Sequence, residues 1–344
     1  MSALNALPDA ELVSPPSDTV SQLSFSPVAD LLALSAWNGE VRIYQVGQNG
    51  MTEGKAGYVH ECAAALCVGW SSDGTKVFSG SSDHTAKIFD ATTGQSAQFG
   101  MHDAPISRIE WINAGSGLVL TGSWDKSLRY WDLRARAPAL QVNLPERCYA
   151  LSCVFPLLVV GTADRHIQVF DINQPTQPYK SLSSPLKMQT RSISCFPDAQ
   201  GFSIGSVEGR VGVQYVDDAK ATANFTFKCH RKDRQGSGVN SRQQQDVFAV
   251  NSIAYNNLGT FVTAGSDGEL TIWDHYLRAR LKTLTAPGPI TSTAFSYTSR
   301  YLAYSVSYDW SKGYAFNSPS VPNKVMVHVC QEHEVERKLV VPKK

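Results

Sequence analysis

Residues 118–132 read Leu118-Val-Leu-Thr-Gly-Ser-Trp-Asp-Lys-Ser-Leu-Arg-Tyr-Trp-Asp132 and form the clearest copy of a motif that recurs along this 344-residue chain. Alternating apolar residues on both sides of the Gly-Ser-Trp-Asp turn predict two short antiparallel strands. Six further copies, some of them divergent, occupy residues 77–90, 261–274, 158–171, 31–46, 202–216 and 301–309. The sequence therefore contains seven copies of one strand–turn–strand unit.

One acidic or amide residue at each turn marks the period of the repeat. These residues are Asn38, Asp83, Asp125, Asp164, Glu208, Asp267 and Asp309. They recur at intervals of 39 to 45 residues, with one longer interval of 59. A period of about 40–45 residues that closes on Trp-Asp or Phe-Asp is typical of WD40 β-propellers. We expect an all-β, seven-bladed propeller as a single domain over residues 1–344, with the ordered ring at about 11–341 and a basic inter-blade loop insertion at 230–246.

The two ends of the chain are expected to close the ring together. Few strands follow Asp309, mainly 324–329 and 338–341, and the segment 11–14 precedes the first complete blade. Because no single blade can bury both of its faces, the ring must close. We predict that residues 11–14 supply the outer strand of blade seven, which leaves only short protected edges.

Polar residues near the turns are predicted to hold the blades together. Each turn acid can accept hydrogen bonds from backbone N–H groups and from the histidine of the preceding loop. In blade three the set is His102, Thr121 or Ser123, Asp125 and Trp131; in blade two it is His60, Ser79 or Ser81, Asp83 and Phe89. Asp164 and Asp267 are assigned the same structural role. Such Ser-His-Asp sets are easily mistaken for a hydrolase triad.

The composition argues against several other classes of protein. A formal net charge of +1 means that any contact with phosphate must come from a local patch. No apolar run reaches the length of about 18 residues that a membrane helix needs, and the N-terminus lacks signal-peptide features. The cysteines form no C-x-x-C pair. We therefore expect a soluble intracellular protein without a membrane partner. Common catalytic motifs are absent, so we expect no enzymatic activity, small-molecule substrate, cofactor or metal. His328, Cys330 and His333 give a weak indication of zinc, but a strand end with a polar tail is favoured.

Several stretches are more specific than the generic repeat. They are Ser35-Ala-Trp-Asn38, Met101-His-Asp-Ala-Pro105, Thr121-Gly-Ser-Trp-Asp-Lys126, Leu144-Pro-Glu-Arg-Cys-Tyr149, Ser184-Pro-Leu-Lys187, Gly205-Ser-Val-Glu-Gly-Arg210, Asn224-Phe-Thr-Phe-Lys-Cys-His-Arg231 and Ser307-Tyr-Asp-Trp-Ser-Lys-Gly313. Together they resemble the WD40 mRNA-export factors of the nuclear pore, the ribonucleic-acid export factor family, over about residues 17–341. A sister family of WD40 spindle-checkpoint proteins shares Glu-Gly-Arg and Phe-Lys-Cys-His-Arg, whereas residues 144–149 and 307–313 favour the export family.

The resemblance implies that the chain binds a short nucleoporin segment, the GLEBS motif, across one face of the ring. Acidic residues of that segment would pair with Arg210, because a guanidinium can hold carboxylates through two parallel bonds. Glu208 belongs to the same turn. Trp37 and Trp124 each precede their turn acid by one residue, so we expect them near a ring face as peptide anchors. The alternative for both is packing between blades.

The resemblance also implies contact with single-stranded RNA or ribonucleoprotein at a side pocket. The candidate residues are Phe225, Phe227, Lys228, Arg231, Trp273, Asp274, His275 and Arg278. Aromatic faces stack on bases and cations follow phosphates, and about three phosphate contacts would give a salt slope of about −2. His275 stands where the family usually has lysine, so charge there would depend on pH. The alternative is that Phe225 and Trp273 belong to the blade core and that the insertion is a solvated loop.

Two functions from different classes therefore compete. The favoured one is a non-enzymatic nuclear-pore adaptor in mRNA export. It would be a monomeric propeller inside a heteromeric complex, located in the nucleus and at the nuclear envelope, with shuttling to the cytoplasm. The alternative is a mitotic spindle-checkpoint scaffold that uses the same face to bind GLEBS-like peptides of kinetochore kinases.

Overall fold

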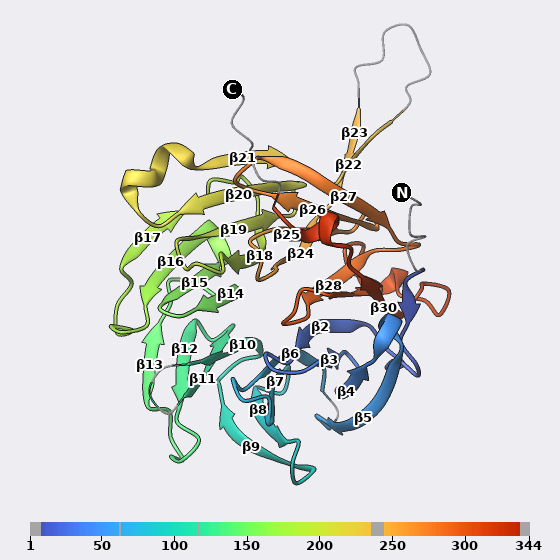
Figure 1. Ribbon diagram of the computed structural model, residues 1–344. Coiled ribbons are helices and arrows are strands. Elements are labelled where there is room, and N and C mark those ends of the chain that lie inside the picture. Colours follow the sequence, from blue (N-terminus) through green and yellow to red (C-terminus); the bar gives the residue numbers. More distant parts are fainter. Residues whose placement is uncertain (1–7, 62, 114, 116, 235–243, 338–344) are drawn as a thin grey trace, which may run out of the picture.

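The chain folds into a ring of seven four-stranded antiparallel sheets, with a further two-stranded sheet on its rim (Figure 1). This arrangement, seen in a computed structural model, confirms the predicted seven-bladed propeller. The structure describes residues 8–61, 63–113, 115, 117–234 and 244–337. The expected strand at 338–341 and the centre of the insertion, residues 235–243, lie outside the described residues.

Each blade runs from an inner strand at the ring axis to an outer strand at the rim. Blade one consists of β2 (Val20–Phe25), β3 (Leu31–Ala36), β4 (Glu40–Val46) and β5 (Thr52–Val59). Blade two consists of β6 (Ala65–Trp70), β7 (Lys76–Ser81), β8 (Thr85–Asp90) and β9 (Gln95–Met101). Blade three consists of β10 (Ile106–Ile112), β11 (Leu118–Ser123), β12 (Ser127–Trp131) and β13 (Leu140–Asn143). Blade four consists of β14 (Cys148–Val154), β15 (Leu157–Thr162), β16 (His166–Asp171) and β17 (Lys180–Ser183). Blade five consists of β18 (Thr190–Cys195), β19 (Gly201–Ser206), β20 (Arg210–Tyr215) and β21 (Phe225–Lys228). Blade six consists of β24 (Val250–Tyr255), β25 (Phe261–Gly265), β26 (Glu269–Asp274) and β27 (Ala279–Thr285).

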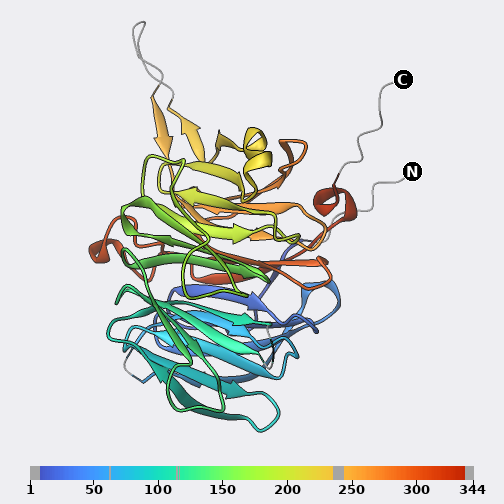
Figure 2. The ribbon, with the colours of Figure 1, turned by 90° about the vertical axis from the view of Figure 1, so that its left-hand side faces the viewer.

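The remaining elements belong to blade seven, to the insertion and to the connections. Blade seven consists of β28 (Ile290–Phe295), β29 (Tyr301–Val306), β30 (Lys324–Val329) and β1 (Ala10–Glu11). The short helical segments are η1 (Gln48–Gly50), η2 (Ala163–Arg165), η3 (Asp218–Ala223), η4 (Tyr314–Phe316) and α1 (Glu332–Val335). The insertion begins with β22 (Arg231–Asp233) and ends with β23 (Gln245–Val247). These two strands pair as a hairpin, where a loop is predicted from the sequence. This hairpin projects from the rim in both ribbon views (Figures 1 and 2).

The N-terminal segment closes the ring, as predicted, but the strand is β1 (Ala10–Glu11) and not residues 11–14. β1 pairs with β30 in the register Ala10↔Val327, and the N–H of Leu12 then donates to the carbonyl of Val325 at 2.8 Å. The inner strands of the first and last blades, β2 and β28, also contact each other. Blade seven is thus built from segments near both ends of the described chain, and in Figure 1 the blue N-terminal strand lies beside β30.

The hydrophobic core lies between the blades and not within them. Leu34 and Tyr44 of blade one pack in one cluster with Ala303 and Val325 of blade seven. The described residues form one such cluster at each of the seven blade interfaces. Alternation along each strand produces this arrangement, because successive side chains point to opposite faces and each face meets a neighbouring blade.

The predicted polar network of blade three joins a loop, a turn and the middle of the sheet. The indole N–H of Trp131 donates to Thr121 Oγ1 at 2.8 Å, and this hydroxyl bonds to His102 Nε2 at 2.7 Å. His102 Nδ1 lies 2.8 Å from Asp125 Oδ2 and donates to that carboxylate. Burial alone would raise the pKa of Asp125, but the hydrogen bonds from His102 and Ser127 hold the pKa below its usual range.

Blade six contains a second complete network. His230 Nδ1 lies 2.9 Å from Asp267 Oδ1, and His230 Nε2 lies 2.9 Å from Thr263 Oγ1. The indole N–H of Trp273 donates to the same Thr263 oxygen at 2.9 Å. Asp267 therefore has a structural partner, as the sequence predicts. Trp273 is predicted to contact RNA, but its indole N–H is already bonded within this network.

Blades two and four depart from the predicted network. His60 Nε2 bonds to Ser79 Oγ at 2.7 Å, but His60 Nδ1 lies 3.9 Å from Asp83, which bonds instead to Thr85. Asp164 is exposed and its side chain has no hydrogen-bond partner among the described residues. The physical reason is that Leu144 occupies the position of the histidine in the loop before β14: its N–H bonds to the carbonyl of Lys126, as that of His102 bonds to the carbonyl of His84. The assignment of Asp164 to the network is thus corrected.

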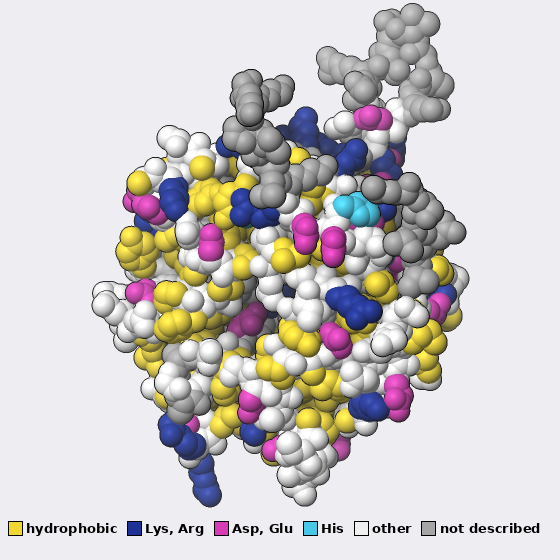
Figure 3. Space-filling view, in the orientation of Figure 1, with side chains coloured by type: hydrophobic (Ala, Val, Ile, Leu, Met, Phe, Trp, Pro, Cys, Tyr) yellow, Lys and Arg dark blue, Asp and Glu magenta, His cyan; other side chains and the backbone are white. Residues whose placement is uncertain are grey.

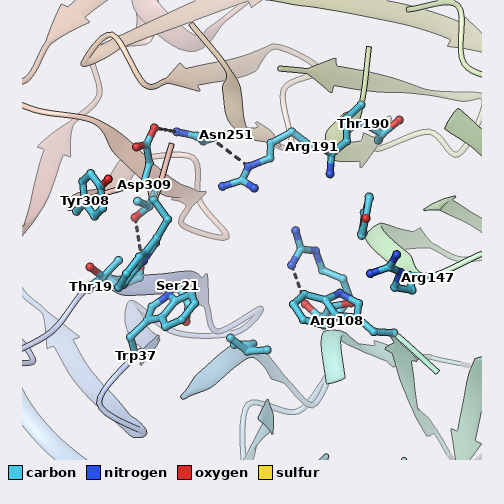
Figure 4. Close-up of a pocket in the computed structure, with 18 residues that line it drawn as sticks. Thr19, Ser21, Trp37, Arg108, Arg147, Thr190, Arg191, Asn251, Tyr308 and Asp309 are labelled. Atoms are coloured by element: carbon cyan, nitrogen blue, oxygen red, sulfur yellow. Dashed lines mark hydrogen bonds between the residues drawn. The ribbon is translucent and has the colours of Figure 1, made fainter. Parts of the chain in front are cut away.

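Every inner strand carries a β-bulge near its start, where the register with the second strand shifts by one residue. The seven bulged residues are Ser21, Leu66, Ser107, Tyr149, Arg191, Asn251 and Thr291. A bulge turns its extra side chain away from the regular alternation. All seven line one cavity of about 360 Å³ at the ring axis, which we call the mouth cavity (Figure 4). The ring is also hollowed at its centre on the face that carries α1 (Figure 3).

His328 joins the two ends of the chain. Its Nδ1 lies 2.6 Å from Asp9 Oδ1, next to β1, and its Nε2 lies 3.0 Å from Glu334 Oε2 in α1. Burial opposes the protonated form of His328, but the two carboxylates raise its pKa to about 9. This set of His328, Asp9 and Glu334, called here the end clamp, explains the histidine that the sequence analysis considered for zinc.

Replacing Asp125 by alanine tests the blade-three network. Asp125→Ala leaves the buried N–H of His102 without an acceptor, so we expect the free energy of unfolding to fall by about 1–3 kcal/mol. Chemical denaturation measures this loss. The matched control is Asp103→Ala, which removes a largely exposed carboxylate paired with Arg129 and should cost well under about 1 kcal/mol. Equal stability of the two variants would contradict the structural role of Asp125.

The end clamp predicts a pH dependence of stability. The pKa of His328 is about 9 in the fold against 6.5 for the free side chain. Its contribution is therefore complete below about pH 6.5 and is lost as the pH rises through about 9. We expect the parent to lose about 1–3 kcal/mol between about pH 6 and pH 10, and His328→Gln to lose clearly less, as measured by thermal unfolding. The control His333→Gln changes an exposed neighbour and should keep the parental profile.

Candidate binding sites on the ring

The face formed by the turns between second and third strands carries exposed tryptophans. Trp37 and Trp124, in the β3–β4 and β11–β12 turns, are 39% and 42% exposed and both line the mouth cavity. Trp310, which follows the turn acid Asp309, stacks against Trp37 with ring centroids 4.7 Å apart. The structure thus brings the two predicted tryptophans together and adds a third. Their exposure makes them available to a ligand, because packing between blades covers only part of each ring.

Arg210 and Glu208 lie on the same face in a separate cleft of about 410 Å³, which we call the Arg210 cleft; it is lined by blade five, by the loop between blades four and five, and by Arg231. Arg210 Nε lies 3.8 Å from Glu208 Oε2, and Glu208 Oε1 accepts a hydrogen bond from the backbone N–H of Lys187 at 2.9 Å. Arg231 lines the cleft as well, and its Nη2 donates to the carbonyl of Glu208 at 2.7 Å. The lining of the cleft thus holds two arginines and one lysine against one acidic residue.

Arg231 therefore lies with the residues predicted for the peptide and not with those predicted for RNA. It starts β22, and the hairpin places it beside the β19–β20 turn. Lys228, at the end of β21, is exposed and remains close in sequence to the aromatic pair Phe225 and Phe227. The basic run 228–234 is thus divided between two surfaces of the ring.

Four of the residues predicted for RNA form one aromatic and cationic patch on the rim, which we call the side patch. The ring centroids of Phe225 and Phe227 lie 6.0 Å apart, and those of Phe227 and Trp273 lie 4.8 Å apart. The guanidinium of Arg278 lies 4.5 Å from the centroid of Phe225. All three aromatic rings are half-buried. Lys and Arg side chains gather at the rim near the hairpin (Figure 3).

Asp274 and His275 follow Trp273 in the chain but are buried, 1% and 3% exposed, and do not belong to the side patch. Asp274 Oδ1 accepts the backbone N–H groups of Tyr276 and Leu277 and so shapes the β26–β27 turn. His275 stacks on Phe196 at 4.6 Å, and burial lowers its pKa to about 4. The imidazole is therefore neutral near pH 7, and the pH-dependent charge expected from the sequence is not supported there.

Comparisons with known proteins agree with the fold and with the motifs. A WD40-domain model of anaphase-promoting complex subunit 4 matches residues 23–114, and a model of the WD domain, G-beta repeat, matches residues 242–274. The chain is 47% identical to the poly(A)+ RNA export protein of Schizosaccharomyces pombe over 332 residues. These aligned residues cover 95% of this chain and 92% of that protein. It is 46% identical over 327 residues to the mRNA export factor GLE2 of Chaetomium thermophilum, with coverage of 93% and 90%. The chain belongs to the family of WD40 mRNA export factors.

Vertebrate members of the export-factor family are similar as well. The mRNA export factor of Xenopus tropicalis is 43% identical over 340 residues, which cover 95% of this chain and 91% of that protein. The resemblance seen in the sequence motifs is thereby confirmed.

Several residues of this export-factor ring line the candidate sites although no role for them is predicted from the sequence. They are Trp310, Arg108, Arg147 and Arg191 at the mouth cavity and Lys187 at the Arg210 cleft. Arg147, Lys187 and Trp310 lie in stretches quoted for the family resemblance, but no role is assigned to them from the sequence. Arg108 and Arg191 lie on inner strands, where no local pattern marks them.

The described part of the chain contains no group of three or more His, Cys, Asp or Glu side chains placed to hold a metal ion. Over the same residues, no helix is long and apolar enough to cross a membrane.

Proposed function

We propose that this protein is a non-enzymatic adaptor in mRNA export that binds an acidic GLEBS-type segment of a nucleoporin at the nuclear pore. The observation that carries the proposal is the Arg210 cleft. Arg210, Arg231 and Lys187 surround a single carboxylate there, so the cleft keeps a positive charge that suits glutamate and aspartate side chains. The printed names of the relatives, which describe RNA and mRNA export, support the biological setting.

The exposed tryptophans extend this surface toward the ring axis. A segment that starts in the Arg210 cleft and crosses the turn face would meet Trp37 and Trp124, whose flat rings suit apolar peptide side chains. The adaptor is thus proposed to combine a charged contact, which orients the segment, with aromatic contacts that bury apolar area.

Calorimetric titration with an acidic GLEBS-type nucleoporin peptide tests the proposal. We expect tight binding by the parent and a loss of affinity of about 10- to 100-fold in Arg210→Ala, because a charge-assisted contact is removed. The control Arg136→Ala removes an exposed arginine of the β12–β13 turn, on the opposite face, and should bind like the parent. Parental affinity in Arg210→Ala would exclude the cleft as the site.

The same titration separates the favoured function from its alternative. A folded parent that ignores the nucleoporin peptide but binds a GLEBS-like peptide of a kinetochore kinase would be a spindle-checkpoint scaffold. Neither function requires catalysis.

The side patch is proposed to contact single-stranded RNA or ribonucleoprotein as the second surface of the adaptor. The half-buried rings of Phe225 and Phe227 are held in place by Trp273, while Arg278 covers Phe225. Bases can stack on such rings and phosphates can approach Arg278 and Lys228. Because few cations are present, binding should be weak without the nucleoporin.

Titration of a fluorescent single-stranded oligoadenylate tests the side patch. Loss of a stacking face in Phe225→Ala should cost about 1–3 kcal/mol of binding free energy. Arg278→Gln should reduce the salt slope by about 0.7 if the arginine neutralises one phosphate. The control Phe316→Ala removes an exposed phenyl ring elsewhere and should have no effect. Unchanged affinity and salt slope in both patch variants would remove the side patch from the function.

A further inference from the structure

The mouth cavity is lined by two arginines that form no ion pair among the described residues. Arg191 enters it from the bulge of β18, and Arg108 enters it from β10, so that the two side chains approach its centre from different sides (Figure 4). Arg191 Nε has a single long hydrogen bond of 3.4 Å to Asn251, and Arg108 Nη1 donates to the carbonyl of Ser107 at 2.7 Å. In the described part of the chain, neither arginine forms a salt bridge. Since a guanidinium carries five N–H donors, most donors of both groups stay available.

The other charges around the cavity do not neutralise this pair. Asp309 is the only acidic residue of its lining, and it already accepts hydrogen bonds from Ser311 and Asn251. Arg147 also lines the cavity and lies 3.9 Å from Glu146, which is shared with a lysine. Burial and the charge of Arg108 both lower the pKa of Arg191. The cavity thus concentrates positive charge at the ring axis.

Uncharged donors in the same lining are also without partners. The hydroxyl of Thr190 and the indole N–H of Trp310 are buried and make no hydrogen bond among the described residues. Both residues line the mouth cavity. Buried polar atoms normally find a partner, so two unpartnered donors in the same lining as the two arginines further indicate a place for a ligand rich in acceptors.

We infer that the mouth cavity binds the phosphate of a phosphorylated serine or threonine in a peptide that lies across the turn face. A phosphate monoester carries about −1.5 to −2 charges and three acceptor oxygens, which match the two arginines and the unpartnered donors. A carboxylate or a phosphate diester of RNA carries one charge and would compensate only one arginine. Trp37 and Trp124 flank the cavity and suit the neighbouring peptide side chains. This site is separate from the Arg210 cleft, but it shares Trp37 and Trp124 with the surface proposed for the nucleoporin segment, so the two peptides would compete there.

NMR titration of the full chain tests the inference, with the indole N–H signals of Trp37 and Trp124 as reporters. The probes are N-acetyl-phosphoserine N-methylamide, its unphosphorylated form, the corresponding glutamate compound, and dimethyl phosphate as a model of an RNA diester. We expect the phosphoserine compound to shift both signals in a saturable way, and the other three to bind at least about tenfold more weakly. Assignment of the two signals comes from Trp37→Phe and Trp124→Phe.

Two variants locate the binding. Arg191→Gln and Arg108→Gln should each weaken the phosphoserine compound about tenfold or more, since each removes a charged donor. Arg136→Gln, which removes one charge from the opposite face, should bind like the parent. Each variant is first compared with the parent by thermal unfolding, and either arginine variant that keeps the fold is sufficient. Equal binding of the glutamate compound or dimethyl phosphate, or undiminished binding in the folded arginine variants, would overturn the inference.

Discussion

The fold depends on one packing constraint: a four-stranded blade has two apolar faces and cannot cover either of them alone. Leu34 and Tyr44 of blade one are buried only because blade seven lies against them, and the same holds at every interface of the described ring. An open row of blades would leave two apolar faces in water. Closure is therefore required, and it comes from the pairing of β1 with β30 and from the end clamp. The ring provides a rigid frame because each blade is held from both sides.

The turn face inherits its geometry from polar groups inside the blades. In blades three and six, a chain of hydrogen bonds runs from a tryptophan through threonine and histidine to the turn acid. The turn that carries Trp124 is thereby fixed to the middle of its sheet. Trp273 serves two surfaces, since its N–H belongs to the network while its ring supports Phe227 in the side patch. Residues that hold the blades and residues offered to ligands are thus neighbours, and sometimes the same residue.

The repeat period predicted the number of blades, the turn positions and the ring closure, because these features depend on local alternation and on tight turns. The binding surfaces were predictable only where a residue lies in a turn, as Trp37, Trp124 and Arg210 do. Arg191 was missed because a bulge has no local sequence signature. Arg231 was placed with the RNA residues because it belongs to a basic run, yet the hairpin carries it to the Arg210 cleft. The burial of His275 depends on Phe196 and Tyr255, which are distant in sequence, so no local pattern reveals it.

The construction of blade seven from both ends of the chain has a consequence for how the molecule is made. Because β1 pairs with β30, the first strand has no partner until nearly the whole chain has been synthesised. Until then the nascent chain exposes an unpaired strand edge and the uncovered apolar faces of blades one and six. Such surfaces favour contact with other chains, and long-range strand pairing is slow. A growing polypeptide of this kind is a natural client for chaperones, and its last blade is the step at which assembly either finishes or fails.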